Sequence, residues 1–148
     1  MIRELTFAEL TLCLRIAPLF FIEGLLPGKF NEDVFIQTWE KLYSINIGKI
    51  HGAFNGDNLC GAIGGIIFPD PNTGEIIATE MFWYVAADFR KGTQGLRLLN
   101  CFENWAIKEG AKRIIMVHLN NLQSDRLSVF YKRKGYSPIE THYIKEVV

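Results

Sequence analysis

A strand–loop–helix–strand unit in the second half of the chain constrains its fold more than any other feature. Residues Glu75–Val85 are rich in β-branched and aromatic side chains, as is typical of a strand. After a glycine-containing loop at 90–95, apolar residues recur at the three- and four-residue spacing of an amphipathic helix, which Gly110 ends. A second apolar strand, Arg113–Leu119, follows. Such units join parallel strands by a right-handed crossover, so the sequence predicts a mixed α/β fold.

The rest of the chain predicts further strands and helices around this unit. In chain order they are strand Ile2–Leu5, a helix capped by Thr6 and ended by Pro18, a helix capped by Asn31, hairpin strands Lys49–Phe54 and Leu59–Phe68, helix Asp125–Lys134, and one or two strands in Tyr136–Val148. The predicted order is β-α-α-β-β-β-α-β-α-β-β, built around a mixed sheet. A length of 148 residues suits one domain, 1–148.

Composition restricts the classes of function. Sixteen basic residues balance sixteen acidic ones, so no strongly basic surface is expected and a nucleic-acid partner is not predicted. No apolar run reaches the ~20 residues of a membrane helix, and the opening MIRELTFAEL lacks the order of a signal peptide. Three scattered cysteines form no zinc motif and fit a reducing compartment. We therefore expect a cytoplasmic protein without a metal or a membrane partner.

The loop before the long helix has the character of an anion site. Arg90, Lys91 and Arg97 surround it, and no carboxylate occurs between Arg90 and Asn100. The first backbone N–H groups of a helix lack acceptors inside the helix, and the helix dipole adds positive potential there. A phosphate or pyrophosphate is the natural occupant. The alternative is a loop whose glycines serve only tight packing.

Two segments resemble the GCN5-related N-acetyltransferase (GNAT) family. VAADFRKGTQGLRLL, from Val85, is similar to the family's acetyl-CoA-binding segment, and FYKRKGY, from Phe130, is similar to its FYxKxGF segment. The element order agrees as well, so the resemblance covers essentially the whole chain and implies a GNAT-like acyltransferase fold. The chain is also similar to small acetyltransferases carried by bacteriophages, which would place it in the host cytoplasm. The chain departs from the family pattern at two positions, with Ala87 where proline is common and Thr93 where the first glycine stands. The side chain of Thr93 bears on the affinity for the cofactor.

The resemblance implies acetyl-CoA as co-substrate and an unidentified primary amine as acceptor. The implied activity is direct transfer of the acetyl group in a ternary complex, and a homodimer is compatible with the family. The cofactor-binding residues that it implies are Val85, Ala87, Arg90, Lys91, Gly92, Thr93, Gln94, Gly95 and Leu96.

Four further residues are candidates for chemistry at the acceptor. The resemblance implies Tyr131 as general acid toward the leaving thiolate. Glu80, among apolar neighbours on one face of its strand by period-two counting, is a candidate base, because burial raises the pKa of a carboxyl group. His118 could serve as a base or hold a water. In the family that the chain resembles, the first two helices and their connection form the acceptor pocket, and Glu23 could face it. The alternatives are a packed core tyrosine for Tyr131, a surface position or an ion pair for Glu80, and a structural histidine for His118.

Two other functions stay open on the sequence. One is a catalytically inactive GNAT-fold protein that acts by macromolecular contact. The other is nucleic-acid binding through Lys112, Arg113 and the basic run 132–134, for which a solvated helix face is the alternative.

Overall fold

The computed structural model describes residues 1–120 and 124–147. The chain divides into two compact units, Met1–Val117 and His118–Val148. The elements of the first unit are β1 (Ile2–Glu4), the 3₁₀ helix η1 (Phe7–Arg15), α1 (Ala17–Glu23), α2 (Glu32–Ser44), β2 (Gly48–Asn55), β3 (Asn58–Pro69), β4 (Ile76–Val85), the 3₁₀ turn η2 (Ala87–Phe89), α3 (Gln94–Lys108) and β5 (Arg113–Ile115).

The five strands form one mixed sheet in the order β1-β2-β3-β4-β5. The first four strands are antiparallel neighbours, and β5 is parallel to β4, with Ile77–Thr79 opposite Arg113–Ile115. The predicted hairpin and the predicted parallel pair around the long helix are confirmed. β5 is shorter than predicted, because its pairing stops at Ile115 while β4 continues to Val85.

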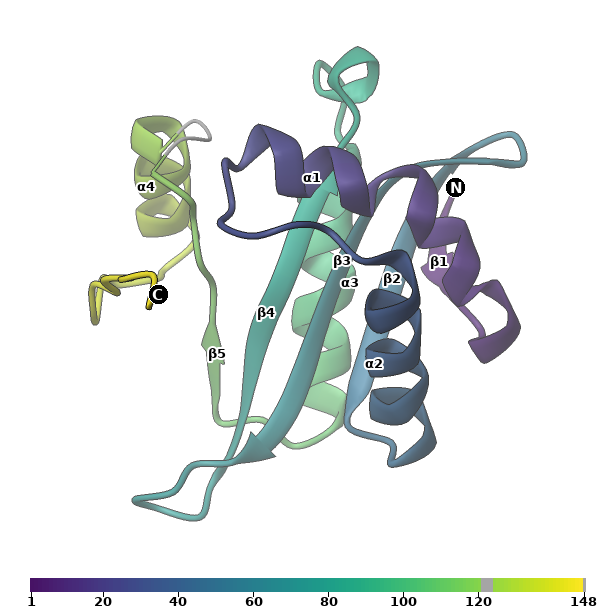
Figure 1. Ribbon diagram of the computed structural model, residues 1–148. Helices are drawn as coiled ribbons and strands as arrows, with labels where there is room; N and C mark the ends of the chain where they lie inside the picture. Colours follow the sequence, from purple (N-terminus) through teal and green to yellow (C-terminus); the bar gives the residue numbers. More distant parts are fainter. Residues whose placement is uncertain (121–123, 148) are drawn as a thin grey trace. The chain divides into compact units, whose positions relative to one another are not determined.

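Consecutive glycines of β3 show how the helices cover the sheet. A Cβ atom on Gly64 would lie 2.8 Å from Cη2 of Trp39 in α2, whereas one on Gly65 would clash with the ring of Phe102 in α3. Adjacent residues of a strand point to opposite faces, so α2 and α3 cover opposite faces of the sheet, as Figure 1 shows. Only glycine permits so close an approach on both sides.

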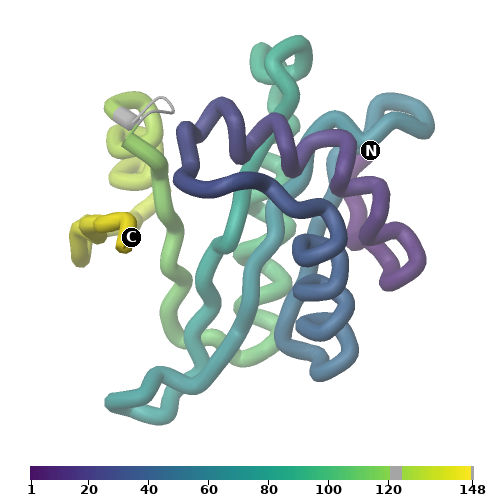
Figure 2. The backbone as a smooth tube through the Cα atoms, in the orientation of Figure 1, coloured from purple at the N-terminus to yellow at the C-terminus, as the bar shows by residue number. Residues whose placement is uncertain are grey.

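The N-terminal helical region differs from the prediction. Thr6 is the N-cap as predicted and forms a capping box with Glu9, but the first segment is a 3₁₀ helix. Pro18 lies in the first turn of a further helix, α1, instead of ending one. Proline suits this position because its missing N–H is not needed there. In Figure 2, α1 and the connection to α2 run side by side in front of the sheet. Asn31 caps α2 as predicted, accepting a hydrogen bond from the Val34 N–H at 3.1 Å.

A β-bulge interrupts β4 beside the candidate base. Phe82 pairs with Gly64 and Glu80 pairs with Gly65, so Met81 is an additional residue in β4. A bulge breaks the alternation of side chains between the two faces. The period-two count that placed Glu80 on one face with Phe82 and Tyr84 therefore does not hold across Met81.

The second unit contains α4 (Ser124–Arg133), which confirms the predicted helix Asp125–Lys134 to within one residue at each end. It ends before Gly135, which has a left-handed conformation (φ 92°). The predicted final strands are wrong for the described residues, since 136–147 contain no strand. Ile139, Tyr143 and Ile144 are each more than three-quarters exposed, so these side chains lack the burial that stabilises a strand. No helix within the described ranges is long and apolar enough to cross a bilayer.

Candidate functional site

The first turn of α3 is unusual in having neither a capping side chain nor an acidic residue. Thr93, at the N-cap position, makes no side-chain hydrogen bond to the helix. At this end the Arg97 N–H donates to the Thr93 carbonyl oxygen, at 3.0 Å. The N–H groups of Gln94, Gly95 and Leu96 therefore have no acceptor within the helix itself. This end of α3 offers donors and positive potential to an anion.

The two glycines of the loop have different neighbours. A Cβ on Gly92 would meet the end of the Gln94 side chain, a flexible group that can move aside. A Cβ on Gly95 would meet nothing closer than 3.6 Å, an ordinary contact with Trp83. Neither packing nor a positive φ demands glycine at Gly95, and its place in the first turn of α3 keeps it a predicted cofactor-binding residue.

Arg90 and Glu23 form an ion pair that the sequence did not predict. The guanidinium lies 2.6 Å from Oε2 of Glu23 and donates a 2.7 Å hydrogen bond from Nε to the Val85 carbonyl oxygen. It also lies over the ring of Tyr84, whose hydroxyl donates to Oε1 of Glu23 at 2.6 Å. The side chain of Arg90 thus connects the end of α1 to the end of β4. Lys91 and Arg97 are the other basic side chains of the predicted anion site.

The environment of Glu23 keeps its carboxylate ionised. Partial burial raises the pKa of Glu23, but the hydrogen bonds from Tyr84 and Arg90 and the charge of Arg90 together lower it below its ordinary value. Burial and the hydrogen bond to Glu23 raise the pKa of Tyr84 to about 12, so its hydroxyl stays protonated. Glu23 is thus a paired anion at physiological pH.

Glu80 lies in a contrasting environment. Glu80 is 6% exposed, and the Val117 N–H donates to its Oε2 at 3.1 Å. Burial raises the pKa of Glu80 to about 8, although the hydrogen bond from Val117 opposes this shift. The carboxyl group lies where β4 and β5 stop pairing, one residue beyond the last pair, Thr79–Ile115. A carboxyl with such a pKa can accept a proton near neutral pH.

The other two candidate catalytic residues lie together in the second unit. The rings of His118 and Tyr131 are 6.3 Å apart in an edge-on arrangement, and Tyr131 also packs against Phe130 and Tyr136. Tyr131 is 7% exposed. Nδ1 of His118 is buried and has no hydrogen-bond partner in the described part of the chain. The aromatic contacts fit packing as well as catalysis, so the roles of both residues stay predictions.

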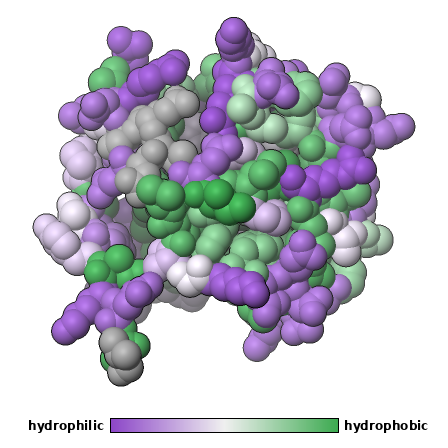
Figure 3. Space-filling model, turned by 45° about the horizontal axis from the view of Figure 1, so that its top comes forward, coloured by the Kyte–Doolittle hydropathy of each residue, from purple (hydrophilic) through white to green (hydrophobic). Residues whose placement is uncertain are grey.

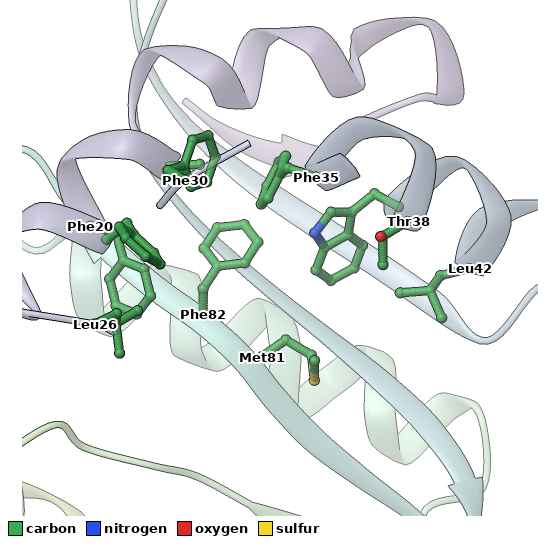
Figure 4. A pocket seen from close by; sticks show the side chains of 11 residues that line it. Phe20, Leu26, Phe30, Phe35, Thr38, Leu42, Met81 and Phe82 are labelled. Carbon is green, nitrogen blue, oxygen red and sulfur yellow. The ribbon is translucent and has the colours of Figure 1, made fainter. Parts of the chain in front are cut away.

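A pocket of about 250 Å³ lies on the α2 side of the sheet, and its lining residues were not predicted from the sequence. α1, the connection to α2, α2 itself and the bulge of β4 supply its lining, and Figure 4 shows aromatic side chains converging on it. Met81 and Phe82 both line it although they are neighbours in β4, which the bulge makes possible. The sequence signal was the high density of phenylalanine between Phe20 and Phe35, which also suits a buried core.

No cluster of three or more His, Cys, Asp or Glu side chains suited to a metal ion occurs in residues 1–120 and 124–147. His51, for example, is buried, and its ring packs at 6.5 Å from that of Trp105. Burial lowers the pKa of His51 to about 4, so this imidazole is a neutral core group. The absence of a metal stays a prediction for the whole chain.

A protein-family model matches most of the chain. The model of the acetyltransferase (GNAT) family matches residues 18–136, which include β4, η2, α3 and α4. A search of curated proteins found no match.

Solved structures share the fold at low sequence identity. A predicted acetyltransferase with acetyl-CoA from Clostridium acetobutylicum has a TM-score of 0.82 and 12% identity, over 99% of this chain and 95% of that one. A ribosomal-protein-alanine N-acetyltransferase from Brucella melitensis biovar Abortus 2308 has a TM-score of 0.75 and 16% identity, over 99% of both chains. An aminoglycoside acetyltransferase from an uncultured soil metagenomic sample, in complex with sisomicin, has a TM-score of 0.76 and 12% identity, over 100% and 96%. At such identities these likenesses show the fold alone.

Proposed function

Because the chain belongs to the acetyltransferase (GNAT) family, we propose that it transfers the acetyl group of acetyl-CoA to a primary amine by direct transfer in a ternary complex. The observation that carries this proposal is the start of α3, which lacks a cap and an acid and has at Gly95 a glycine that packing does not require. A structural neighbour described with acetyl-CoA adds support for the co-substrate.

The pyrophosphate of the co-substrate would bind at the first turn of α3. The N–H groups of Gln94, Gly95 and Leu96 would donate to it, and Lys91 and Arg97 would add positive charge. The neighbouring backbone at Val85 and Ala87 would pair with the extended pantetheine arm. Support for that pairing comes from β4, whose ladder with β5 ends at Thr79, six residues before Val85.

We assign Arg90 and Thr93 different roles in binding the co-substrate. The side chain of Arg90 is bound to Glu23 and Val85, so we assign it to positioning of the loop and not to direct binding of the phosphates. Thr93 precedes α3 without capping it, which leaves its N–H and hydroxyl for the ligand. Gly92 lies beside the end of the Gln94 side chain.

Glu80 is the proposed base. When bound, acetyl-CoA supplies an activated acetyl group, and the C–S bond of the thioester breaks as the C–N bond to the amine forms. The attacking amine must lose a proton, and Glu80 or a water that it holds would take this proton. Its pKa of about 8 matches the task, because a base works best when its pKa lies near the working pH.

Tyr131 is the proposed acid, on the strength of the family motif that contains it. A phenol is protonated at neutral pH and can donate to the departing thiolate. Tyr131→Phe should therefore lower kcat and leave CoA affinity nearly unchanged. His118, whose ring packs against that of Tyr131, is the alternative titratable group.

Glu23 was predicted at the acceptor pocket, and we propose that it acts there indirectly. It ends α1, whose residues Ala17, Phe20 and Phe21 line the pocket. Its ion pair with Arg90 would hold this wall against the end of β4.

Two variants test the proposed binding of CoA, each at the second residue of a helix. Gly95 is the second residue of α3, and Asp33 is the second residue of α2. Gly95→Asp should weaken CoA binding, measured by calorimetry, by at least about 100-fold, because a carboxylate would occupy the anion position. The helix should keep its stability, since aspartate is a better helix residue than glycine.

Asp33→Gly is the matched control and should leave CoA affinity unchanged. Unchanged affinity in folded Gly95→Asp would overturn the site. Binding of CoA without turnover of any amine would favour a catalytically inactive binding protein instead.

A further inference from the structure

We propose that the pocket beside the bulge of β4 binds an aromatic ring carried by the acceptor amine, so that the acceptor class is an arylalkylamine. This inference rests on the proposed acetyl transfer and adds to it the chemistry of the acceptor. It depends on the lining of the pocket, its size and its place on β4.

The lining is aromatic and carries no charge. Its aromatic members are Phe20, Phe21, Phe30, Phe35, Trp39 and Phe82. Their rings contact one another at tilted or edge-on angles: Phe82 lies 5.6 Å from Trp39 and 6.0 Å from Phe35. A further ring fits such a cluster, because aromatic rings prefer these arrangements.

The lining offers few hydrogen-bonding groups to a polar substituent. Its polar side-chain groups are the indole N–H of Trp39 and the hydroxyl of Thr38, and the Thr38 hydroxyl already donates to the Val34 carbonyl oxygen at 2.7 Å. A sugar with several hydroxyl groups placed here would lose its water without gaining a partner for each of them. The pocket therefore selects against aminoglycosides.

The size of the pocket fits one ring system. An apolar cavity of about 150 Å³ suffices for benzene, and this pocket measures about 250 Å³. It is smaller than the ~300–1,000 Å³ typical of sites for a whole drug-sized ligand. One aromatic group of the acceptor would enter, and the amine would stay outside.

The pocket lies at the same bulge of β4 as the candidate base. Phe82 pairs with Gly64 on the α2 side of the sheet, where the pocket is, and Glu80 pairs with Gly65, which faces α3. Met81 and Phe82, which line the pocket, directly follow Glu80 in β4, and Met81 is half exposed. Apolar surface continues outside the pocket on α1 and its connection, where Leu19, Ile22 and Leu25 are exposed. Figure 3 shows hydrophobic side chains gathered near the centre of one face of the molecule.

The first test compares amines. Phenethylamine should be acetylated with a KM at least about tenfold lower than that of ethylamine, because burial of the ring adds apolar binding energy. Preference for spermidine, or for a peptide with an N-terminal alanine, would overturn the aromatic acceptor and leave the acetyltransferase activity standing.

The second test fills the pocket. Thr38→Trp adds a large side chain to the lining, and Gln37→Trp adds the same side chain at an exposed position of α2 outside it. We expect Thr38→Trp to raise the KM of phenethylamine at least about tenfold, and Gln37→Trp to leave it unchanged. Equal effects of the two variants would overturn the assignment of the pocket.

A third measurement tests binding of a ring in the pocket independently of acetyl transfer. Benzyl alcohol has the ring but no amine, and its binding can be followed by NMR in the presence of CoA. Binding to the wild type and Gln37→Trp, with loss in Thr38→Trp, would support the pocket even if no amine were acetylated, an outcome that would overturn the proposed function alone. No binding of benzyl alcohol to the wild type would overturn the pocket.

Discussion

Glu23 and Glu80 are the same residue type in opposite environments. Glu23 is one-third exposed, with a guanidinium at 2.6 Å and a tyrosine hydroxyl donating to it. Glu80 is buried and receives one backbone hydrogen bond, from Val117. The pKa of Glu23 is consequently lowered, and burial raises that of Glu80 to about 8.

This difference suits Glu23 to a structural role and Glu80 to the proposed transfer of a proton. Glu23 is ionised throughout the physiological range, so it can hold Arg90 but is a poor proton acceptor. Glu80 changes charge near neutral pH, so it can take a proton from an ammonium and release it again. Two carboxyl groups with pKa values pushed apart are a common sign of divided roles in an active site.

The largest expected effect is on turnover. Glu80→Gln keeps the shape of the side chain and an oxygen for the Val117 N–H, but removes the base. At pH 8, kcat/KM should fall by about 10²–10⁴-fold in a steady-state assay. Glu109→Gln, at an exposed position at the end of α3, is the control and should retain wild-type turnover. Wild-type activity of Glu80→Gln would remove Glu80 from the mechanism and make His118→Asn the next variant to test.

The second prediction is that Glu80→Gln, which should lower activity, raises the stability of the folded protein. The pKa of Glu80 is about 8 in the folded protein and 4.5 as a model value. Between these values the folded state holds a proton that the unfolded state has lost, so Glu80 lowers stability as pH rises from 4.5 to 8. Glu80→Gln should thus stabilise the protein by about 3 kcal/mol at pH 7.

Urea unfolding of both proteins at pH 5 and pH 8 checks this prediction. The difference between the variant and the wild type should grow across that interval. A difference that stays the same at both pH values would mean that Glu80 is ionised in the folded state.

The smallest effect is expected for the stability of the Glu23→Gln variant. Because the folded pKa of Glu23 is lowered, its contribution to stability is present above the unfolded pKa and is lost as pH falls through the folded pKa. Glu23→Gln should destabilise the protein at pH 7 by less than about 1 kcal/mol, since the pair is partly exposed. Unfolding at pH 7 and pH 3 measures it, and an equal loss at both would contradict an ionic contribution.

Local signals in the sequence predicted most elements of the first unit. Asn31 and Thr6 were found as caps because their side chains act on adjacent backbone groups, and Gly110 was found because it follows a long amphipathic pattern. α1 was missed because Pro18 ends a helix or begins one according to the conformation of the preceding residue. The strands expected after Tyr136 were wrong because alternation alone does not provide a partner strand.

The candidate site was less predictable than the fold. Glycines and charges mark the predicted anion site within a few consecutive residues, so the sequence alone could propose it, and it stays a prediction. The ion pair of Glu23 with Arg90 spans 67 positions, and the pocket is assembled from helices and a strand that only folding brings together. The bulge at Met81 left no signal that period-two counting could detect.

The pH dependence of kcat/KM for an amine, measured for the wild type and Glu80→Gln, tests the central claim most directly. If Glu80 takes the proton and chemistry limits the rate, the wild-type profile rises with an apparent pKa near 8, and the variant loses or displaces this limb. A uniform drop at every pH with a raised KM would show that Glu80 only binds the ammonium. An unaltered profile and rate in the variant would contradict the account.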